Sequence, residues 1–468
     1  MTFPRKARPF MRMNMASLAA SALALVLAMT VGLVSTAAAK KAHVVHISVV
    51  SLIPGSTQAA FNEFDNKVAQ FEAANPGISV RGVQYQWLPA TFAAKLASGT
   101  LPTVFTVPFT DGRSLGDNGQ LANLTKYAKA EPYYKDFNPS VIAEGIDSKK
   151  QVIAIPEAAY AQALTYNRQL FSQAGLNPNK PPTTWAQLEA DAKQISQKTG
   201  KAGYAEMGAS DNTAGWILTT VTDALGGRME TGIGTKAKAT FNNPQAVQAL
   251  NILKTMRWND NSMGSNFGLS WGTMNQAFAA GQVGMFISGS DVYTNMVQAD
   301  NINPSIYGLA PIPTAKSKTA AVMGGGTLAA VSPKATPAQI SAAMKWISFY
   351  YMEKLINRKA AIQDAKTLIK NKQPVGVPEL PVFNQTVYNQ DQKWIKPYIN
   401  VPEKQFAPFT SGIFKDKLTP EPESATQAIY GDLDPVVQAV FSSQGANPSS
   451  LLSQANSTGQ ASIASSGS

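Results

Sequence analysis

The chain lacks cysteine altogether and has only two histidines among its 468 residues. Without cysteine it can form no disulfide bridge, offer no thiol nucleophile and carry no lipid on an N-terminal cysteine. A serine–histidine–aspartate triad would need His43 or His46, which both lie at the first predicted strand. Three residues apart on a strand, their side chains point to opposite faces, which favours ordinary strand residues over a metal pair. We therefore expect no metal site, and we name no catalytic residue.

Motifs for nucleotides and nucleic acids are also missing. The triplet Gly324-Gly325-Gly326 is not followed by the lysine and the serine or threonine of a phosphate-binding loop. Although the net charge is +11, the basic residues are scattered and form no run longer than a pair such as Lys149-Lys150. This distribution favours a solvated surface over a nucleic-acid groove. We expect neither a cofactor nor a nucleic-acid partner.

One long apolar run is present, and it lies near the N-terminus. Residues 18–34 are mostly apolar, and Ala37-Ala38-Ala39 offers an A-x-A cleavage site. Four basic residues precede the run: Arg5, Lys6, Arg8 and Arg12. The pattern predicts a signal peptide over 1–39, cleaved near Ala39, and hence a periplasmic protein. An uncleaved membrane anchor is the alternative, because the run is only slightly shorter than the ~20 residues that span a bilayer.

The region after the signal peptide predicts an α/β fold with a parallel sheet. Apolar residues at 44–52 and 78–83 predict two strands, and Asn75-Pro76-Gly77 ends the helix between them. The apolar face of that helix is made by Phe61, Phe64, Val68 and Phe71. A strand–helix–strand order implies parallel strands, and ligands bind beyond the carboxyl ends of such strands. A third strand ends at Phe109-Thr110-Asp111, which places Thr110 and Asp111 on that side.

The interval 151–195 predicts two strands followed by two helices. A short apolar run ends at Pro156, a second run covers 161–166, and Tyr160 lies between them. A proline-rich turn follows, after which Thr184 and Gln187 form a capping box. The helix that begins there has one apolar face, made by Trp185, Leu188, Ala192 and Ile195. Further along, Thr336 followed by a proline predicts another helix start.

Several motifs resemble the sugar-binding, maltose-binding-like family of extracellular solute-binding proteins that serve ABC importers. The resemblance rests on the order and spacing of these motifs along most of 40–350. The matching residues are Phe71-Glu72 with Asn75-Pro76-Gly77, Tyr166-Asn167, Leu170-Phe171, Ala174-Gly175-Leu176, Pro181-Pro182 with Thr184-Trp185, and Phe278 with Gly281 and Met285. Two positions depart from the family pattern, since Thr103 replaces an aspartate and Asp291 replaces a common tryptophan. The second departure bears on the choice of ligand.

The fold implied by this resemblance has two lobes, each a sheet flanked by helices, hinged around a ligand cleft. Three crossings between the lobes would lie near 156–161, 322–328 and 371–378. Lobe one would take 40–157 and 328–371, and lobe two would take 160–322 and 375–450. Residues 451–468 are rich in serine, glutamine, alanine and glycine, and we expect them to form a disordered tail.

The resemblance also implies a cleft built from aromatic, acidic and glycine residues. Trp216 and Trp271 are compatible with ligand contact and equally with a place in the core. The residues expected to bind ligand are Ser51, Thr110, Asp111, Tyr160, Trp216, Trp271, Asp291, Gly324 and Gly325.

The implied function is capture of a sugar or polyol by a monomer without enzymatic activity, followed by delivery to the membrane permease of an ABC importer. Two alternatives stay open. A secreted carbohydrate-active enzyme could use paired carboxylates, with candidates at Asp111, Glu157, Asp211 and Asp291. A binder of a sugar phosphate is compatible with the net charge of +7 that remains once the four basic residues of the signal peptide are removed from +11 (11 − 4).

Overall fold

The computed structural model describes residues 44–52, 56, 58–232 and 234–466. From Val44 onward the chain forms one compact unit. The predicted signal peptide and its cleavage site near Ala39 lie outside the described residues. Among the described residues, no helix combines the length and the apolar character needed to cross a membrane.

The fold is α/β, and its described residues build one mixed sheet of eight strands in the order β2–β1–β3–β9–β4–β7, with β10 beside β9 and β8 beside β4. The strands are β1 Val45–Val50, β2 Ile78–Val83, β3 Val104–Pro108, β4 Ala154–Asn167, β7 Met285–Gly289, β8 Tyr307–Pro311, β9 Val322–Val331 and β10 Leu418–Thr419. A separate antiparallel pair is formed by β5 Glu230–Thr231 and β6 Lys238–Ala239. Since β1 runs parallel to β2 and β3, the predicted parallel opening is confirmed.

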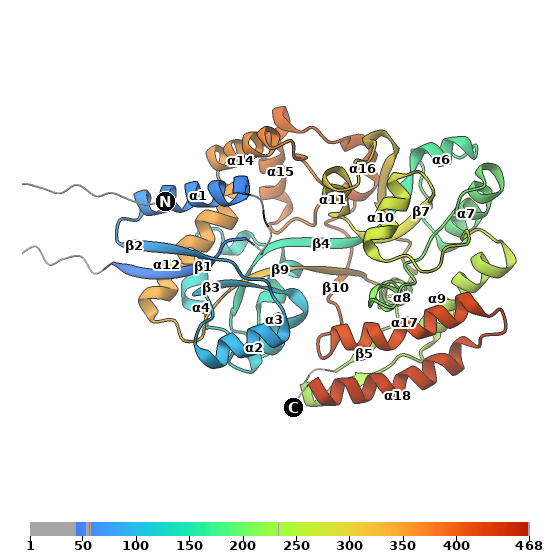
Figure 1. The fold of residues 1–468 in the computed structure, drawn as a ribbon, viewed down its shortest axis with the longest axis horizontal. Helices are drawn as coiled ribbons and strands as arrows, with labels where there is room; N and C mark the ends of the chain where they lie inside the picture. Colours follow the sequence, from blue (N-terminus) through green and yellow to red (C-terminus); the bar gives the residue numbers. More distant parts are fainter. Residues whose placement is uncertain (1–43, 53–55, 57, 233, 467–468) are drawn as a thin grey trace, which may run out of the picture. The chain divides into compact units, whose positions relative to one another are not determined.

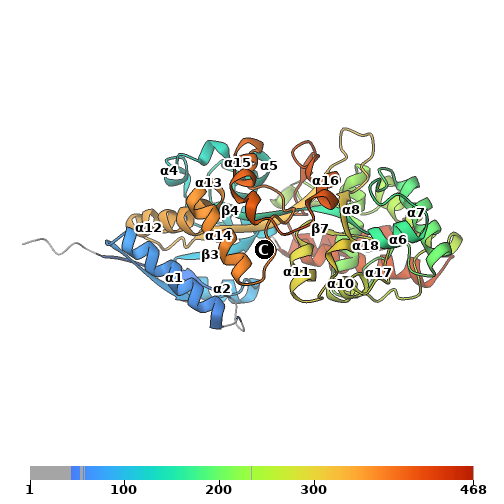
Figure 2. The same ribbon diagram turned by 90° about the horizontal axis from the view of Figure 1, so that it is seen from above.

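Helices gather in two groups at the two ends of the sheet (Figures 1 and 2). The group around β1–β3 contains α1 Gln58–Ala74, α2 Pro89–Ser98, α3 Phe109–Asp117, α4 Thr125–Ala128, α5 Pro139–Ile142, α12 Pro337–Ile347, α13 Glu353–Ile356, α14 Arg358–Lys370 and α15 Gln385–Ile395. The group around β7 and β8 contains α6 Arg168–Gln173, α7 Trp185–Thr199, α8 Thr213–Leu225, α9 Pro244–Lys254, α10 Trp271–Ala279, α11 Val292–Gln298, α16 Glu403–Thr410, α17 Thr426–Ser442 and α18 Pro448–Ser466.

Two long strands pass from one group of helices to the other. β4 pairs with β9 over residues 154–161 and then with β7 and β8 over residues 162–167. β9 in turn pairs with β3 near one end and with β10 at the other. Figure 1 shows this ribbon running from the end that carries α1 and α12 to the end that carries α8 and α17. The chain therefore has the predicted two-lobe arrangement, with β4 and β9 as two of its connections.

The helix starts read from the sequence are confirmed. The Thr184 side chain accepts a hydrogen bond from the backbone N–H of Gln187 at 3.2 Å and caps α7, whose buried face is made by Leu188, Ala192 and Ile195. Thr336 caps α12 in the same way, with Gln339 as the reciprocal partner and Pro337 as the first helical residue. The reciprocal capping box is complete in α12 only, because in α7 the Gln187 side chain accepts from the N–H of Thr183 at 3.0 Å instead of that of Thr184.

Pro156 does not end a strand, contrary to the prediction. β4 is continuous from Ala154 to Asn167, and the pairing with β9 shifts its register between Pro156 and Ala158. A bulge of this kind removes the need for a ladder hydrogen bond from a residue that has no N–H. The predicted pair of short strands is therefore one strand that serves both lobes.

The C-terminal segment is a helix, so the expected disordered tail at 451–468 is wrong for the described residues up to 466. α18 buries Leu452 and Ile463. Gly459 lies so close to Phe241 that a side chain there would clash with the ring. Phe241 is also tied to the helix through its backbone N–H, which donates to Asn456 Oδ1 at 2.7 Å. Small residues gave this segment low hydrophobicity, yet they let the helix approach its neighbours closely.

α15 packs beside α13 and α14, although the predicted lobe-two range of 375–450 includes it. The segment before α15 is also fastened to the first group of helices. Asn138 Nδ2 donates to the Pro381 carbonyl at 3.1 Å, and Phe137 stacks on Phe383 with ring centroids 4.8 Å apart. α15 is thus attached to the first group of helices, whereas α16 packs against β8 in the second group.

Candidate ligand-binding cleft

Among the described residues, a short stretch of β9 is paired with another strand along only one of its two edges. Thr327 pairs with Pro108 at the end of β3, and Met323 pairs with Thr419 in β10. The three glycines at 324–326 lie between these pairings and are bonded in register to β4 alone. Their free edge therefore lies beyond the carboxyl end of β3. In open α/β sheets this is the side on which ligands bind.

The glycines on both sides of Tyr160 make room for its ring. A methyl group added to Gly325 would clash with Tyr160 Oη, so the phenol lies across β9 toward its free edge. A methyl group on Gly289 would clash with Asp291 Oδ1 and would come within 3.2 Å of Tyr160 Cδ2. Tyr160, Asp291 and Gly325, three of the residues expected to bind ligand, are therefore brought together.

Trp216 forms a wall next to Tyr160, and we call these two residues the aromatic corner. Their rings meet edge to face, with centroids 6.5 Å apart and planes at 83°. The backbone before Trp216 is held by α17, because Asp434 accepts hydrogen bonds from the N–H of Gly215 at 2.8 Å and of Asn212 at 2.7 Å. The indole itself is half-buried against the core.

The polar edge of Trp216 is directed at Glu421, a residue that the sequence analysis did not identify. Glu421 lies in a segment that begins with β10, and we call residues 418–424 the acidic strap. Its carboxylate accepts a hydrogen bond from Tyr430 Oη at 2.9 Å. Burial raises the pKa of Glu421 to about 7, and the charge of Asp111 adds to the rise, whereas the hydroxyl of Tyr430 and the nearby indole N–H of Trp216 oppose it. Glu421 thus connects the aromatic corner to the α3 side of the cleft.

The other charges near the aromatic corner are also carboxylates. The pKa of the Tyr160 hydroxyl is raised well above its usual value by burial and by the charges of Glu421 and Asp291. Burial also raises the pKa of Asp111, whose Oδ2 accepts a hydrogen bond from Thr110 Oγ1 at 2.7 Å. Burial raises the pKa of Asp291 as well. The arrangement offers several hydrogen-bond acceptors around two aromatic rings.

Arg113 is a cation of the same region, and it already has a partner. Its Nε lies 3.5 Å from Glu423 Oε2, so that α3 is joined to the acidic strap by an ion pair. Glu144 is close enough for its pKa to feel both charges. Burial and the charge of Glu423 raise that pKa to about 7, and Arg113 opposes the rise. With two carboxylates beside it, Arg113 leaves little positive potential for an anion.

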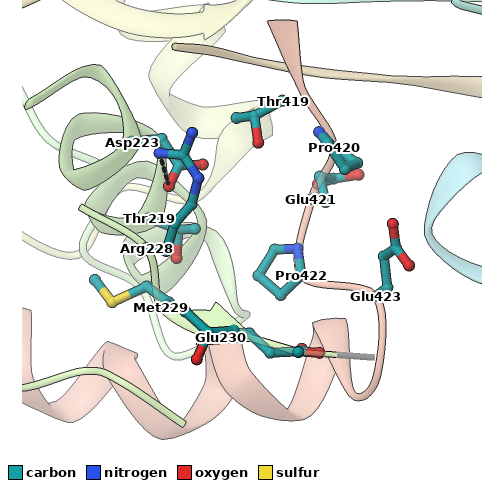
Figure 3. Close-up of a pocket in the computed structure, with 12 residues that line it drawn as sticks. Thr219, Asp223, Arg228, Met229, Glu230, Thr419, Pro420, Glu421, Pro422 and Glu423 are labelled. Carbon is teal, nitrogen blue, oxygen red and sulfur yellow. Dashed lines mark hydrogen bonds and ion pairs between the residues drawn. The ribbon is translucent and has the colours of Figure 1, made fainter. Parts of the chain in front are cut away.

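Two cavities adjoin the acidic strap. One, of about 350 Å³, lies between α3 and the strap and is lined by Phe109, Arg113, Glu144, Gly324 and Thr419 among others. The other, of about 200 Å³, lies between the strap and the end of α8 (Figure 3). In this second cavity Arg228 is paired with Asp223 at 3.4 Å and donates to the Thr319 carbonyl at 2.9 Å. Both of these partners of the Arg228 guanidinium belong to lobe two.

Three predicted site residues stand apart from the aromatic corner in the contacts seen among the described residues. Ser51 continues the β1–β2 pairing through its N–H, which donates to the Val83 carbonyl at 2.9 Å. It lies at the carboxyl end of β1, where a ligand site is expected. Trp271 is the first residue of α10 and packs, half-buried, against the core. A methyl group added to Gly324 would lie 3.3 Å from the Tyr160 carbonyl and 3.9 Å from Leu380, and it would not meet the Tyr160 ring. Ligand contact by these three residues stays a prediction.

The described residues contain no group of three or more histidine, aspartate or glutamate side chains arranged to hold a metal ion. The expected site residues supply hydrogen-bond acceptors, aromatic faces and backbone groups. That set can hold a polyhydroxylated molecule, because hydroxyls need acceptors at the rim and ring C–H faces pack on aromatic side chains.

Comparison with known proteins places the architecture among solute-binding proteins. Residues 54–354 match the family of bacterial extracellular solute-binding proteins. The cyclic alpha-maltosyl-1,6-maltose binding protein from Arthrobacter globiformis superposes with a TM-score of 0.68 over 90% of this chain and 99% of that one, at 20% identity. UgpB from Mycobacterium tuberculosis, in complex with glycerophosphocholine, gives a TM-score of 0.65 over 90% and 98% of the two chains, at 17% identity.

Sequence relatives match over shorter stretches. The sn-glycerol-3-phosphate-binding periplasmic protein UgpB of Yersinia pestis is 32% identical over 126 residues, which is 26% of this chain and 28% of that protein. The Escherichia coli protein of the same description is 28% identical over 207 residues, or 42% and 46% of the two chains. These matches span less than half of the relatives' length. The family match, in contrast, covers β4, β9 and most of lobe one, and the chain therefore belongs to the bacterial extracellular solute-binding protein family.

Proposed function

We propose that this protein captures a sugar or polyol between its two lobes, outside the cytoplasmic membrane, and delivers it to the permease of an ABC importer. It acts as a monomer and as a carrier, so the ligand leaves the protein chemically unchanged. Its membership of the solute-binding family supports the carrier role. The solved relatives include proteins described as bound to maltose, ribitol and D-mannitol, which supports the ligand class.

The observation that carries the ligand class is the aromatic corner with its ring of carboxylates. Tyr160 and Trp216 offer two perpendicular aromatic faces, Asp291 and Glu421 lie near Tyr160, and Asp111 lies near Glu421. Sugars and polyols present both C–H surfaces and many hydroxyls. A site that mixes aromatic rings with acceptors satisfies both parts of such a ligand.

The same observation favours an uncharged ligand over a sugar phosphate, although the curated relatives are described as binding sn-glycerol 3-phosphate. A phosphate carries about two negative charges near neutral pH and is held by cations or helix N-termini. The charges around the aromatic corner are carboxylates, and Arg113 is paired with Glu423. Bringing a phosphate beside buried carboxylates costs several kcal/mol in like-charge repulsion.

Lobe closure is the motion that this function requires. Lobe one, at 40–157 and 328–371, would rotate toward lobe two, at 160–322 and 375–450, with α15 moving together with lobe one. The hinge would use β4, β9 and the segment near 371–378. A ligand that touches both lobes favours the closed form because it adds contacts that the open form lacks.

A thermal-shift screen of the protein lacking residues 1–39 tests the ligand class. The panel holds neutral sugars, polyols and the matching sugar phosphates. We expect a neutral compound to raise the melting temperature and the corresponding phosphate to raise it less. Stabilisation by phosphates alone would reverse the proposed preference.

Recovery of the bound compound separates a carrier from a carbohydrate-active enzyme that uses paired carboxylates. The stabilising compound is incubated with the protein, extracted and analysed by chromatography. A carrier returns it intact after prolonged incubation, whereas an enzyme returns cleavage products that accumulate with time.

A further inference from the structure

The acidic strap is fixed in place on both sides of Glu421. Before it, β10 pairs in register with β9, so that Thr419 is aligned with Met323. After it, Ser424 N–H and hydroxyl donate to the carboxylate of Glu230 at 3.2 and 2.5 Å. Glu421 itself lies between Pro420 and Pro422, which restrict the backbone on either side. The position of its Cα therefore depends little on the side chain that it carries.

The carboxylate of Glu421 faces two lobe-two helices. Tyr430 Oη of α17 donates to Oε1 at 2.9 Å, and the indole N–H of Trp216 on α8 is close enough to the same carboxylate to lower its pKa. α8 and α17 are also in close backbone contact, because a methyl group on Gly215 would clash with the Tyr430 carbonyl. The contact between the helices thus fixes the backbone of Trp216, and Glu421 lies at the polar edge of its ring.

We infer that Glu421 is the positioning residue of the cleft: it holds the indole of Trp216 edge to face with Tyr160, so that the ring presents a pre-arranged surface to the ligand. This inference rests on the proposed function, since it assigns a role within the same cleft. When the indole N–H interacts with the protein, the face of the ring remains available to pack against C–H groups of the ligand. Pre-arranging that face lowers the entropy that the side chain loses when ligand binds.

The inference predicts coupling between two positions 205 residues apart (421 − 216). The test is a double-mutant cycle of Glu421→Ala and Trp216→Phe, with affinity measured by calorimetry for the neutral sugar found in the screen. Phenylalanine keeps an aromatic ring but has no N–H for Glu421 to hold. We expect Glu421→Ala to weaken binding about tenfold in the wild-type background and about twofold or less in the Trp216→Phe background.

Two further variants separate positioning from loss of stability. Glu421→Gln keeps an acceptor oxygen for the indole, and we expect it to restore much of the affinity that Glu421→Ala loses. Glu206→Ala is a matched control, because Glu206 is a buried lobe-two glutamate that accepts a tyrosine hydroxyl, that of Tyr204, at the same 2.9 Å. It removes a similar hydrogen bond away from Trp216, so it should reduce stability without weakening binding to the same degree.

Near-ultraviolet circular dichroism of the ligand-free proteins gives an independent readout. Glu421→Ala should change the tryptophan signal, and the change should disappear when Trp216 is already phenylalanine. Equal effects of Glu421→Ala in both backgrounds, on affinity and on this signal, would overturn the inference while leaving the proposed function standing. If no sugar binds the wild-type protein, the proposed function fails, and the spectral coupling still decides whether Glu421 orients Trp216.

Discussion

The indole of Trp216 and the phenol of Tyr160 meet at nearly a right angle, with planes at 83° and centroids 6.5 Å apart. The two residues come from different elements, since Trp216 lies in α8 and Tyr160 in the strand that connects the lobes. A change in the angle between the lobes would therefore move Tyr160, one wall of the cleft, because this residue lies in β4. Ligand contact with this pair would couple binding directly to the hinge.

Trp216→Ala should weaken sugar binding by about 2 kcal/mol, roughly thirtyfold, because truncating a buried aromatic anchor commonly costs that much. The fold should persist, since the indole is only half-buried and α8 is held by Asp434. Calorimetry on the folded variant measures the loss. Trp394→Ala on α15 is the control for an indole outside the aromatic corner. An unchanged affinity in Trp216→Ala would leave Tyr160 and Trp271 as the candidates.

Saturating ligand should make the protein more compact. Closure around a hinge buries the facing surfaces of the two lobes, which reduces the radius of gyration. Small-angle X-ray scattering with and without the sugar from the screen measures this change. A ligand that binds tightly but leaves the radius of gyration as it was would contradict the clamp mechanism.

Stability should fall as the pH rises from about 4.5 to 8. Burial raises the pKa of Glu206 from 4.5 to about 8 and that of Asp223 from 3.8 to about 8, the latter despite its pairing with Arg228. Between these values the folded protein binds more protons than the unfolded chain. The free energy of unfolding therefore decreases with pH across this window and levels off above it.

Urea unfolding at pH 5 and pH 8 checks this dependence. Glu206→Gln should reduce the difference between the two conditions, because the amide does not titrate. Equal stability of the wild-type protein at both pH values would mean that these carboxyls stay ionised in the folded state.

The C-terminal helix should contribute to global stability. Leu452 is completely buried in α18, and its replacement by alanine should cost about 2–5 kcal/mol, through lost burial and the cavity left behind. Gln454→Ala, on the exposed side of the same helix, is the control and should have little effect. Urea unfolding compares the two variants. If Leu452→Ala were as stable as Gln454→Ala, α18 would not be part of the cooperative fold.

The sequence predicted best where local chemistry decides the structure. The side chains of Thr184 and Thr336 satisfy N–H groups within one helical turn, so both helix starts could be located from a few residues. The parallel opening was predictable because apolar periodicity changes clearly between 44–52 and the helix that follows. The family resemblance placed Tyr160 and Gly325 at two lobe crossings, but that they pair with each other was not predicted.

Prediction failed where distant contacts outweigh local pattern. Pro156 normally disfavours a strand interior, but the bulge beside it allows β4 to continue. Residues 451–466 have few large apolar side chains. Even so, Leu452 is buried, and Gly459 packs so closely against Phe241 that a larger residue would not fit. Glu421 was missed because nothing in Pro-Glu-Pro-Glu indicates that a tryptophan far earlier in the chain needs an acceptor there.

The shared ribbon of β4 and β9 has a consequence for how the protein melts. Each lobe completes its sheet with strands whose other halves belong to the neighbouring lobe. If one lobe unfolded, the strands of the other lobe would lose backbone hydrogen-bond partners. Sheet edges that are paired in the intact molecule would then be exposed. The two lobes can rotate relative to each other, as lobe closure requires. We nevertheless expect them to unfold together, in a single calorimetric transition.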